Sequence, residues 1–146
     1  MKIYLDMCSI QRPLDTKTQL RIAVEAEAIL GIIAPCEAGQ IDLMASDALV
    51  FETAQSPHPV WKRYALEVLT KASLFVPTDR QVEERARAFH ALGLKPLDAL
   101  HLATAVEEQA NYFCTCDDRL LRRGQTADTV RTKVVSPLEL ITEVTR

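Results

Sequence analysis

Short apolar segments alternate with helical patterns along this chain of 146 residues, and this alternation limits the possible folds more than any other feature. Each apolar segment is short and continuous, which predicts a buried strand. Strands separated by helices form parallel sheets that are covered by those helices. We therefore expect a single α/β domain over residues 1–146, with a mostly parallel sheet of about five strands. The expected strands are Ile3–Leu5, Ile41–Ala45, Leu74–Val76, Tyr112–Thr115 and Lys133–Val135.

The segments between these strands carry helical patterns with recognisable ends. Ser136 begins a capping box with proline at the first helical position, and Thr78 with Gln81 forms a second candidate box. We expect Pro35 to close the first long helix and Met7–Lys17 to form a loop. The expected helices cover residues 18–34, a segment after the N-cap at 46, and residues 60–71, 78–92, 96–109 and 137 onward.

Composition and charge restrict the class of protein. Charged residues make up 25% of the chain and the net charge is −3, which argues against a general nucleic-acid coat protein. It does not argue against a nucleic-acid enzyme, because a local basic rim can hold phosphates. Four scattered cysteines predict a reduced, cytoplasmic setting, with structural packing for Cys114 and Cys116. We expect no signal peptide, no membrane span and no membrane partner.

The helix that begins near Pro96 contains an energetic anomaly. Its positions after Pro96 are almost entirely apolar, which predicts a buried helix. Asp98 lies within that run, and burying a carboxylate is costly unless a charge, a metal ion or hydrogen-bond donors meet it. We therefore expect Asp98 to face a specific partner.

Three further acids are expected at the same edge of the sheet as Asp98. Asp6 ends the first strand and Asp117 follows the fourth, so both lie at the carboxyl ends of parallel strands. The helix of Asp98 leads into a parallel strand, which places its beginning at that edge too. Glu52 lies about 9 Å along the helix after the second strand and can reach inward. Such a cluster repels itself unless it binds protons or a divalent cation, and oxygen ligands favour Mg²⁺ or Mn²⁺.

Other phosphate chemistries lack their motifs here. The sequence contains no glycine-rich phosphate loop and no serine or cysteine nucleophile elbow. Covalent phosphotransfer through Asp6 would require a second aspartate at the position of Cys8. A flavodoxin-like receiver would require an acid pair after the first strand and a lysine after the last. What remains is metal-assisted hydrolysis of a phosphate ester.

With these acids placed, the chain resembles a PIN domain, and most of all the ribonuclease toxins of the VapC type. The resemblance rests on Ile3–Asp6, on Glu52, on Leu97–Ala105 and on Phe113–Asp117, in this order. It implies a three-layer α/β/α fold and Mg²⁺- or Mn²⁺-dependent cleavage of RNA that leaves a 5′-phosphate and a 3′-hydroxyl. It also implies a possible cognate antitoxin and a homodimer. The catalytic acids by position are Asp6, Glu52, Asp98 and Asp117, of which Asp6, Asp98 and Asp117 bind the metal.

The sequence departs from the resembled family directly after Asp6. Met7 and Cys8 stand where that family usually has Thr or Ser and then Asn, which leaves Ser9 as the candidate polar partner of Asp6. Thr115 is expected to orient an acid through a hydrogen bond. Asp118 is a rival to Asp117, and the favoured assignment gives Asp118 the N-cap of the next helical turn.

Five basic residues flank the acid segments and are candidates for phosphate contacts, although a solvated helix face is an alternative for the last three. They are Arg12, Lys95, Arg119, Arg122 and Arg123. His101 follows Asp98 by three positions, and we expect it to be packed and bonded to the backbone. Trp61 and Phe89 are candidates for a dimer interface. The rival function is a non-catalytic module of the same fold that binds RNA or protein.

Overall fold

The centre of the fold is a sheet of five parallel strands in the order β3-β2-β1-β4-β5. The computed structural model describes residues 1–146. β1 is the middle strand: Ile3 pairs with Leu43 of β2 on one side and with Tyr112 of β4 on the other. The first strand of the chain therefore holds the two halves of the sheet together. The strands are β1 Lys2–Leu5, β2 Asp42–Ser46, β3 Leu74–Val76, β4 Tyr112–Cys114 and β5 Lys133–Val135.

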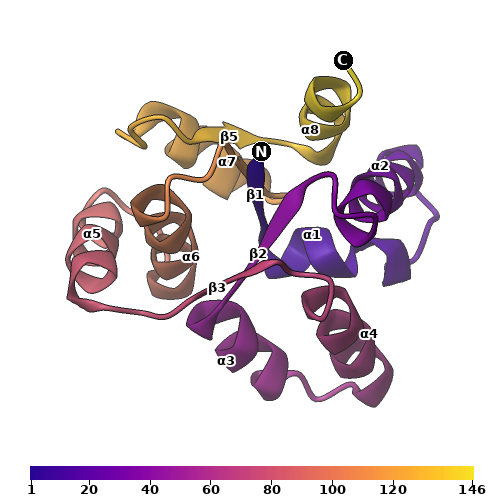
Figure 1. Ribbon diagram of the computed structural model, residues 1–146, viewed down its shortest axis with the longest axis horizontal. Helices are drawn as coiled ribbons and strands as arrows, with labels where there is room; N and C mark the ends of the chain where they lie inside the picture. Colours follow the sequence, from indigo (N-terminus) through magenta and orange to yellow (C-terminus); the bar gives the residue numbers. More distant parts are fainter.

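Helices cover both faces of this sheet and complete a three-layer α/β/α sandwich. In Figure 1, α5 and α6 lie on one side of the strands, and α2, α4 and α8 lie on the other. The order of elements confirms the predicted fold class. The helices are α1 Met7–Gln11, α2 Leu20–Glu37, α3 Asp47–Gln55, α4 Pro59–Leu69, α5 Arg80–Ala91, α6 Pro96–Glu107, α7 Asp118–Thr126 and α8 Pro137–Val144, with a short 3₁₀ helix at Arg12–Leu14.

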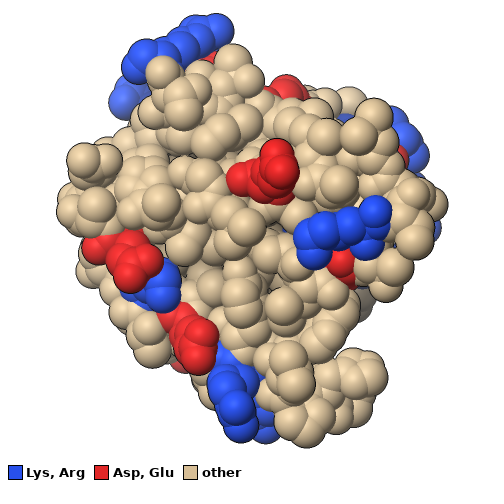
Figure 2. Space-filling model, turned by 90° about the vertical axis from the view of Figure 1, so that its right-hand side faces the viewer, with Lys and Arg blue, Asp and Glu red and all other residues tan.

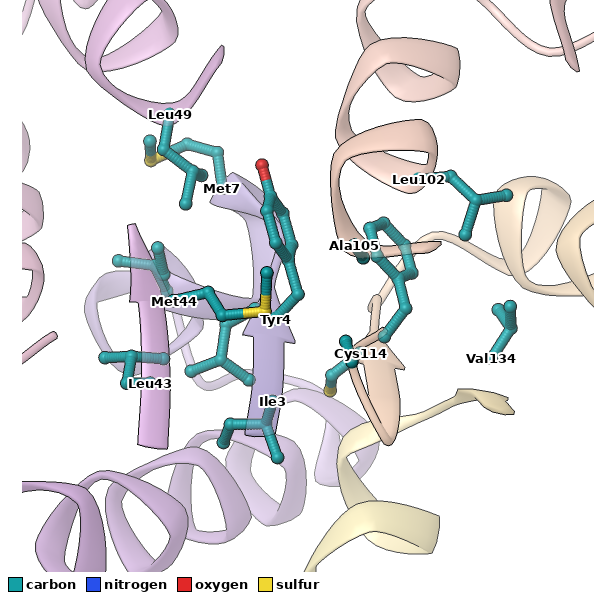
Figure 3. Close-up of a cluster of buried hydrophobic side chains, with 14 of the residues drawn as sticks. Ile3, Tyr4, Met7, Leu43, Met44, Leu49, Leu102, Ala105, Cys114 and Val134 are labelled. Atoms are coloured by element: carbon teal, nitrogen blue, oxygen red, sulfur yellow. The ribbon is translucent and has the colours of Figure 1, made fainter. Parts of the chain in front are cut away.

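The core is formed where β1 and α6 face each other. Tyr4 and Phe113 are fully buried and their rings stack with centroids 5.4 Å apart. Leu102 and Ala105 of α6 are also fully buried. Figure 3 shows the Tyr4 side chain rising from β1 with its hydroxyl at the edge of this apolar cluster, between α3 and α6. As predicted, α6 is a buried helix with Pro96 at its first turn.

Three local predictions were wrong. Residues 7–14 form α1 and a 3₁₀ turn instead of a loop, because Asp6 caps α1 by accepting a hydrogen bond from the Ser9 amide. Pro35 lies inside α2, which continues to Glu37, because a proline in the last turn forfeits only one backbone hydrogen bond. The N-cap of α5 is Asp79, whose carboxylate accepts from the Val82 amide, so Thr78 and Gln81 form no capping box.

The surface corrects one further expectation. Phe89 is only 3% exposed and packs in the core, so it is not available for the expected dimer interface with Trp61. All four cysteines are free, and Cys114 and Cys116 are buried. None of the helices combines the length and the apolar character that a membrane span requires.

Gly124 and Gly31 both lie in helices, but an added side chain would have less space at Gly124 than at Gly31. A Cβ at Gly124 in α7 would lie 2.8 Å from Cγ1 of Val134, whereas at Gly31 in α2 it would lie 3.2 Å from the flexible end of Ile141. We expect Gly124→Ala to lower the unfolding free energy by about 1–3 kcal/mol through overpacking against β5. We expect Gly31→Ala, the control, to raise it by up to about 1 kcal/mol. Urea unfolding of both variants tests this, and equal stability would contradict the packing of α7 on β5.

Candidate functional site

Asp6 is the most enclosed acid of the site. It follows β1 directly, is 4% exposed, and its Oδ1 accepts a hydrogen bond of 3.0 Å from the Ser9 amide. The thiol of Cys8 donates to the same carboxylate at 3.1 Å. Burial raises the pKa of Asp6, while hydrogen bonds from Thr115 and Cys8 oppose the rise. The hydroxyl of Ser9, the predicted polar partner of Asp6, donates to the Cys114 carbonyl instead. Asp6 is met by the Cys8 thiol and the Ser9 amide, and the Thr115 side chain also favours its charged form.

Asp98 lies at the third position of α6 and is half-buried. Its carboxylate makes no hydrogen bond or ion pair within the protein, unlike those of Asp6 and Asp117. Burial raises the pKa of Asp98, and the negative charges of Asp6 and Asp117 raise it further. These effects place Asp6 and Asp117, which come from two other elements, within electrostatic range of Asp98.

Asp117 completes this group at the end of β4. It is exposed, and its Oδ1 accepts hydrogen bonds from the amides of Arg119 and Leu120, which makes it the N-cap of α7. The prediction that Asp118 is that N-cap was therefore wrong. The Thr115 hydroxyl accepts a 3.1 Å hydrogen bond from the Asp117 amide, and the same side chain lowers the pKa of Asp6, so Thr115 acts on both acids.

Glu52 is held apart from the three aspartates by a histidine. Its Oε1 lies 2.7 Å from Nε2 of His101, and its side chain is one-third exposed. Glu52 borders a hollow with Met7 and Trp61, whereas Asp98 and Asp117 border a different hollow. The prediction of a backbone bond for His101 was wrong, because both of its ring nitrogens bond to side chains. No sequence pattern indicated that His101 binds Glu52. Its spacing of three positions from Asp98 did place both residues on the same face of α6.

Basic side chains surround the hollow that holds Asp98 and Asp117. Lys95, Arg119 and Arg123 line it. Arg123 is fixed by a hydrogen bond from Nη1 to the Leu92 carbonyl at 3.1 Å. On the face over α2, α4 and α8, Figure 2 shows acids and bases interspersed without a continuous basic surface. The basic residues at the hollow are therefore the ones placed to meet an anion beside the acids.

Comparison with known proteins assigns the family. The family model described as "PIN domain" matches residues 20–125, which include Glu52, Asp98 and Asp117. The chain belongs to the PIN domain family. Asp6 lies before the matched segment, and in the structure it lies within electrostatic range of Asp98.

Solved structures share this PIN fold at low sequence identity. The chain is similar to a structure described as FitAcB from Neisseria gonorrhoeae, with 16% identity, a TM-score of 0.56, and coverage of 93% of this chain and 98% of that one. It is similar to PAE2754 from Pyrobaculum aerophilum, with 16% identity, a TM-score of 0.54, and coverage of 99% and 98%. No curated protein matches the sequence. At these identities the structural likeness shows the fold alone.

Arg12, one of the residues expected to bind phosphate, is held by ion pairs within the protein. Arg12 pairs with Asp15 at 2.9 Å and with Glu25 at 3.0 Å, and its side chain is only 16% exposed. Arg12 therefore serves the structure of the N-terminal segment and is not free to meet a phosphate. Arg21, which sequence reasoning missed, pairs with Glu25 and with Asp118. This network ties α2 to the beginning of α7, next to Asp117.

The raised pKa values predict how stability depends on pH. A carboxyl group with a higher pKa in the folded state stabilises the fold fully below its unfolded pKa of about 4, and this contribution is lost as the pH rises through the folded pKa. We therefore expect Asp98→Asn to be more stable than the wild type at pH 7 without metal. After allowance for solvent screening, its melting temperature should rise by roughly 1–3 °C.

The same comparison at low pH provides the control. Near pH 3 the two proteins should melt at the same temperature, because Asp98 is then protonated in both states. Glu27→Gln, at an exposed position of α2 without an ion pair, removes the same charge far from the aspartates. Calorimetry in a chelating buffer measures all three proteins. A wild type that is more stable than Asp98→Asn at pH 7 would contradict the electrostatic coupling of the three acids.

Proposed function

We propose that this PIN-domain protein is a divalent-metal-dependent endoribonuclease that hydrolyses RNA phosphodiester bonds. The observation that carries the proposal is the group of three aspartates at the carboxyl edge of the sheet. Asp6, Asp98 and Asp117 come from separate elements, and the charges of Asp6 and Asp117 both act on Asp98. Mutually repelling carboxylates are costly to the fold, and a cation that they share would relieve the repulsion. Membership of the PIN family supports a nuclease.

The donor set fits a hard divalent cation such as Mg²⁺ or Mn²⁺. All three groups are carboxylates, and Asp98 has no partner of its own within the protein. One oxygen of Asp117 is used by the cap of α7, which leaves the other free. No three acidic, histidine or cysteine side chains stand close enough together to chelate an ion as they are placed here. Binding would therefore require a side-chain rotation at Asp98 or Asp117, both of which reach the solvent.

The protein's own residues would divide the remaining work. A bound cation would stabilise charge on the scissile phosphate and make water more acidic. Glu52, whose Oε2 makes no bond within the protein, would accept the proton of the attacking water. Thr115 and Cys8 fix the rotamer of Asp6. Phosphate contacts would come from Lys95, Arg119, Arg122 and Arg123, of which all but Arg122 line the hollow beside Asp98.

The biological setting is a finer part of the proposal. The resemblance to VapC-type toxins supports a toxin role in a type II toxin–antitoxin system, within the cytoplasm. The partner would then be a cognate antitoxin that covers the acid edge, and the active form a homodimer. One observation favours the alternative of a non-catalytic module that binds RNA or protein: no chelating arrangement of three side chains is present.

Cleavage assays test the catalytic part. We expect RNA cleavage by the wild type in Mg²⁺ or Mn²⁺, and none with a chelator. Asp6→Asn and Asp117→Asn should each lower the rate at least about 100-fold, because the bound ion supplies several kcal/mol of charge stabilisation. Asn still caps α1 and α7, so both variants should fold. Asp128→Asn is the control, since Asp128 is exposed and does not line the hollow that holds Asp98 and Asp117. Cleavage that persists in both variants would disprove the metal site.

Melting temperatures test ion binding without any substrate. We expect Mn²⁺ at about 100 times its dissociation constant to add about 2.7 kcal/mol to the stability, or roughly 5–10 °C in melting temperature. The shift should be lost in Asp98→Asn, which lacks one ligand charge. A non-catalytic module without a metal site would show no shift in either protein.

A further inference from the structure

A buried chain of four side chains runs from the core to Glu52. Ser46 and Tyr4 are fully buried and His101 is 1% exposed. Ser46 Oγ lies 2.8 Å from the Tyr4 hydroxyl, which lies 2.6 Å from Nδ1 of His101, and Nε2 of His101 lies 2.7 Å from Oε1 of Glu52. The four residues come from β2, β1, α6 and α3, so the chain joins four elements at one point.

The donor and acceptor of each hydrogen bond in this series of side chains follow from the bonding of Ser46, its most buried end. Ser46 Oγ accepts a hydrogen bond from the Leu49 amide, as the N-cap of α3, which leaves its hydroxyl hydrogen for Tyr4. Tyr4 can then donate to Nδ1 of His101. His101 carries its proton on Nε2 and donates it to Glu52. With these directions every hydrogen in this series of four side chains has a partner.

The opposite direction leaves a buried group unpaired. If Nδ1 of His101 carried the proton, Tyr4 would accept there and would have to donate to Ser46. The Ser46 hydroxyl hydrogen would then have no acceptor inside the core, which is unfavourable. A neutral imidazole protonated at Nδ1 would also turn a lone pair on Nε2 toward the Glu52 carboxylate. The core therefore selects the tautomer that donates to Glu52.

We propose that His101 is a positioning residue that fixes the Glu52 carboxylate for catalysis. This inference rests on the proposed nuclease function. Glu52 is one-third exposed, and without a partner its long side chain would sample many rotamers. The bond from Nε2 of His101 fixes Oε1 and leaves Oε2 free to meet a substrate water. His101 also lies within electrostatic range of Asp6 and Asp98, so the residue that holds Glu52 connects its hollow with the aspartates.

Two amide substitutions at position 101 separate this role from a structural one. The amide nitrogen of Gln reaches the position of Nε2, whereas the shorter Asn side chain reaches only the position of Nδ1. We expect His101→Asn to lower kcat about 10–100-fold with little change in KM, as for other groups that orient a catalytic ligand. His101→Gln should recover most of the rate. His90→Gln, at an exposed histidine outside the chain, is the control.

The coupling to Glu52 is measured in a second background. In Glu52→Gln, adding His101→Asn should change kcat little further, because the carboxylate that His101 positions is already gone. Circular dichroism and melting curves establish that each variant is folded. Equal rates for His101→Asn and His101→Gln, or an undiminished loss in the Glu52→Gln background, would overturn the positioning role.

The tautomer gives a readout that does not depend on activity. The protein has three histidines, and nitrogen-15 NMR of labelled imidazoles distinguishes Nε2–H from Nδ1–H. We expect the Nε2–H tautomer for His101, assigned by the loss of its signals in His101→Asn. A protonated Nδ1 would overturn the hydrogen-bonded chain. A wild type without nuclease activity would overturn the proposed function and the positioning role with it, whereas a wrong tautomer in an active enzyme would overturn the positioning role alone.

Discussion

Burial of β1 between β2 and β4 is the constraint on which the rest of the structure depends. The strand is enclosed on both faces and both edges, so Ile3, Tyr4 and Leu5 have no exposure. The chain must leave the sheet immediately after Leu5, and it does so at Asp6, whose carboxylate caps α1. A charge at this point is enclosed because of the strand before it. The burial of β1 therefore both stabilises the sheet and makes a charge on Asp6 unfavourable.

The main features of the fold and site could be predicted from local sequence patterns. A short apolar run that stops at an acid marks a strand end, as at Asp6, and proline at Pro96 marks a helix start. These signals are local, and the parallel topology then places the acids at one edge. The hydrogen-bond partners of the individual site residues could not be predicted. The bond between His101 and Glu52 joins residues 49 positions apart, and no periodicity encodes such a pair.

Sequence patterns also could not show which basic residues are free to bind phosphate. In sequence, Arg12 and Arg123 look alike, because each lies near an acid segment. In the structure Arg12 is occupied by Glu25, a carboxylate of the adjacent helix α2, while Arg123 lies at the hollow beside Asp98. Cys8 shows the reverse case, since a residue that departs from the usual pattern supplies a polar partner for Asp6 through its thiol. Which side chain is free depends on neighbours that only the folded chain brings together.

The central place of β1 also determines when the fold can be completed during synthesis. β1 leaves the ribosome long before β4, since the contact from the Lys2 amide to Asn111, just before β4, spans 109 positions. Until β4 is made, one edge of β1 has no partner, and the carboxylate of Asp6 lacks the hydroxyl of Thr115. Parallel sheets with such distant pairings fold slowly. The acid site is therefore assembled only after β4 and Asp117 have been translated, and a nascent chain that ends before β4 carries no formed site.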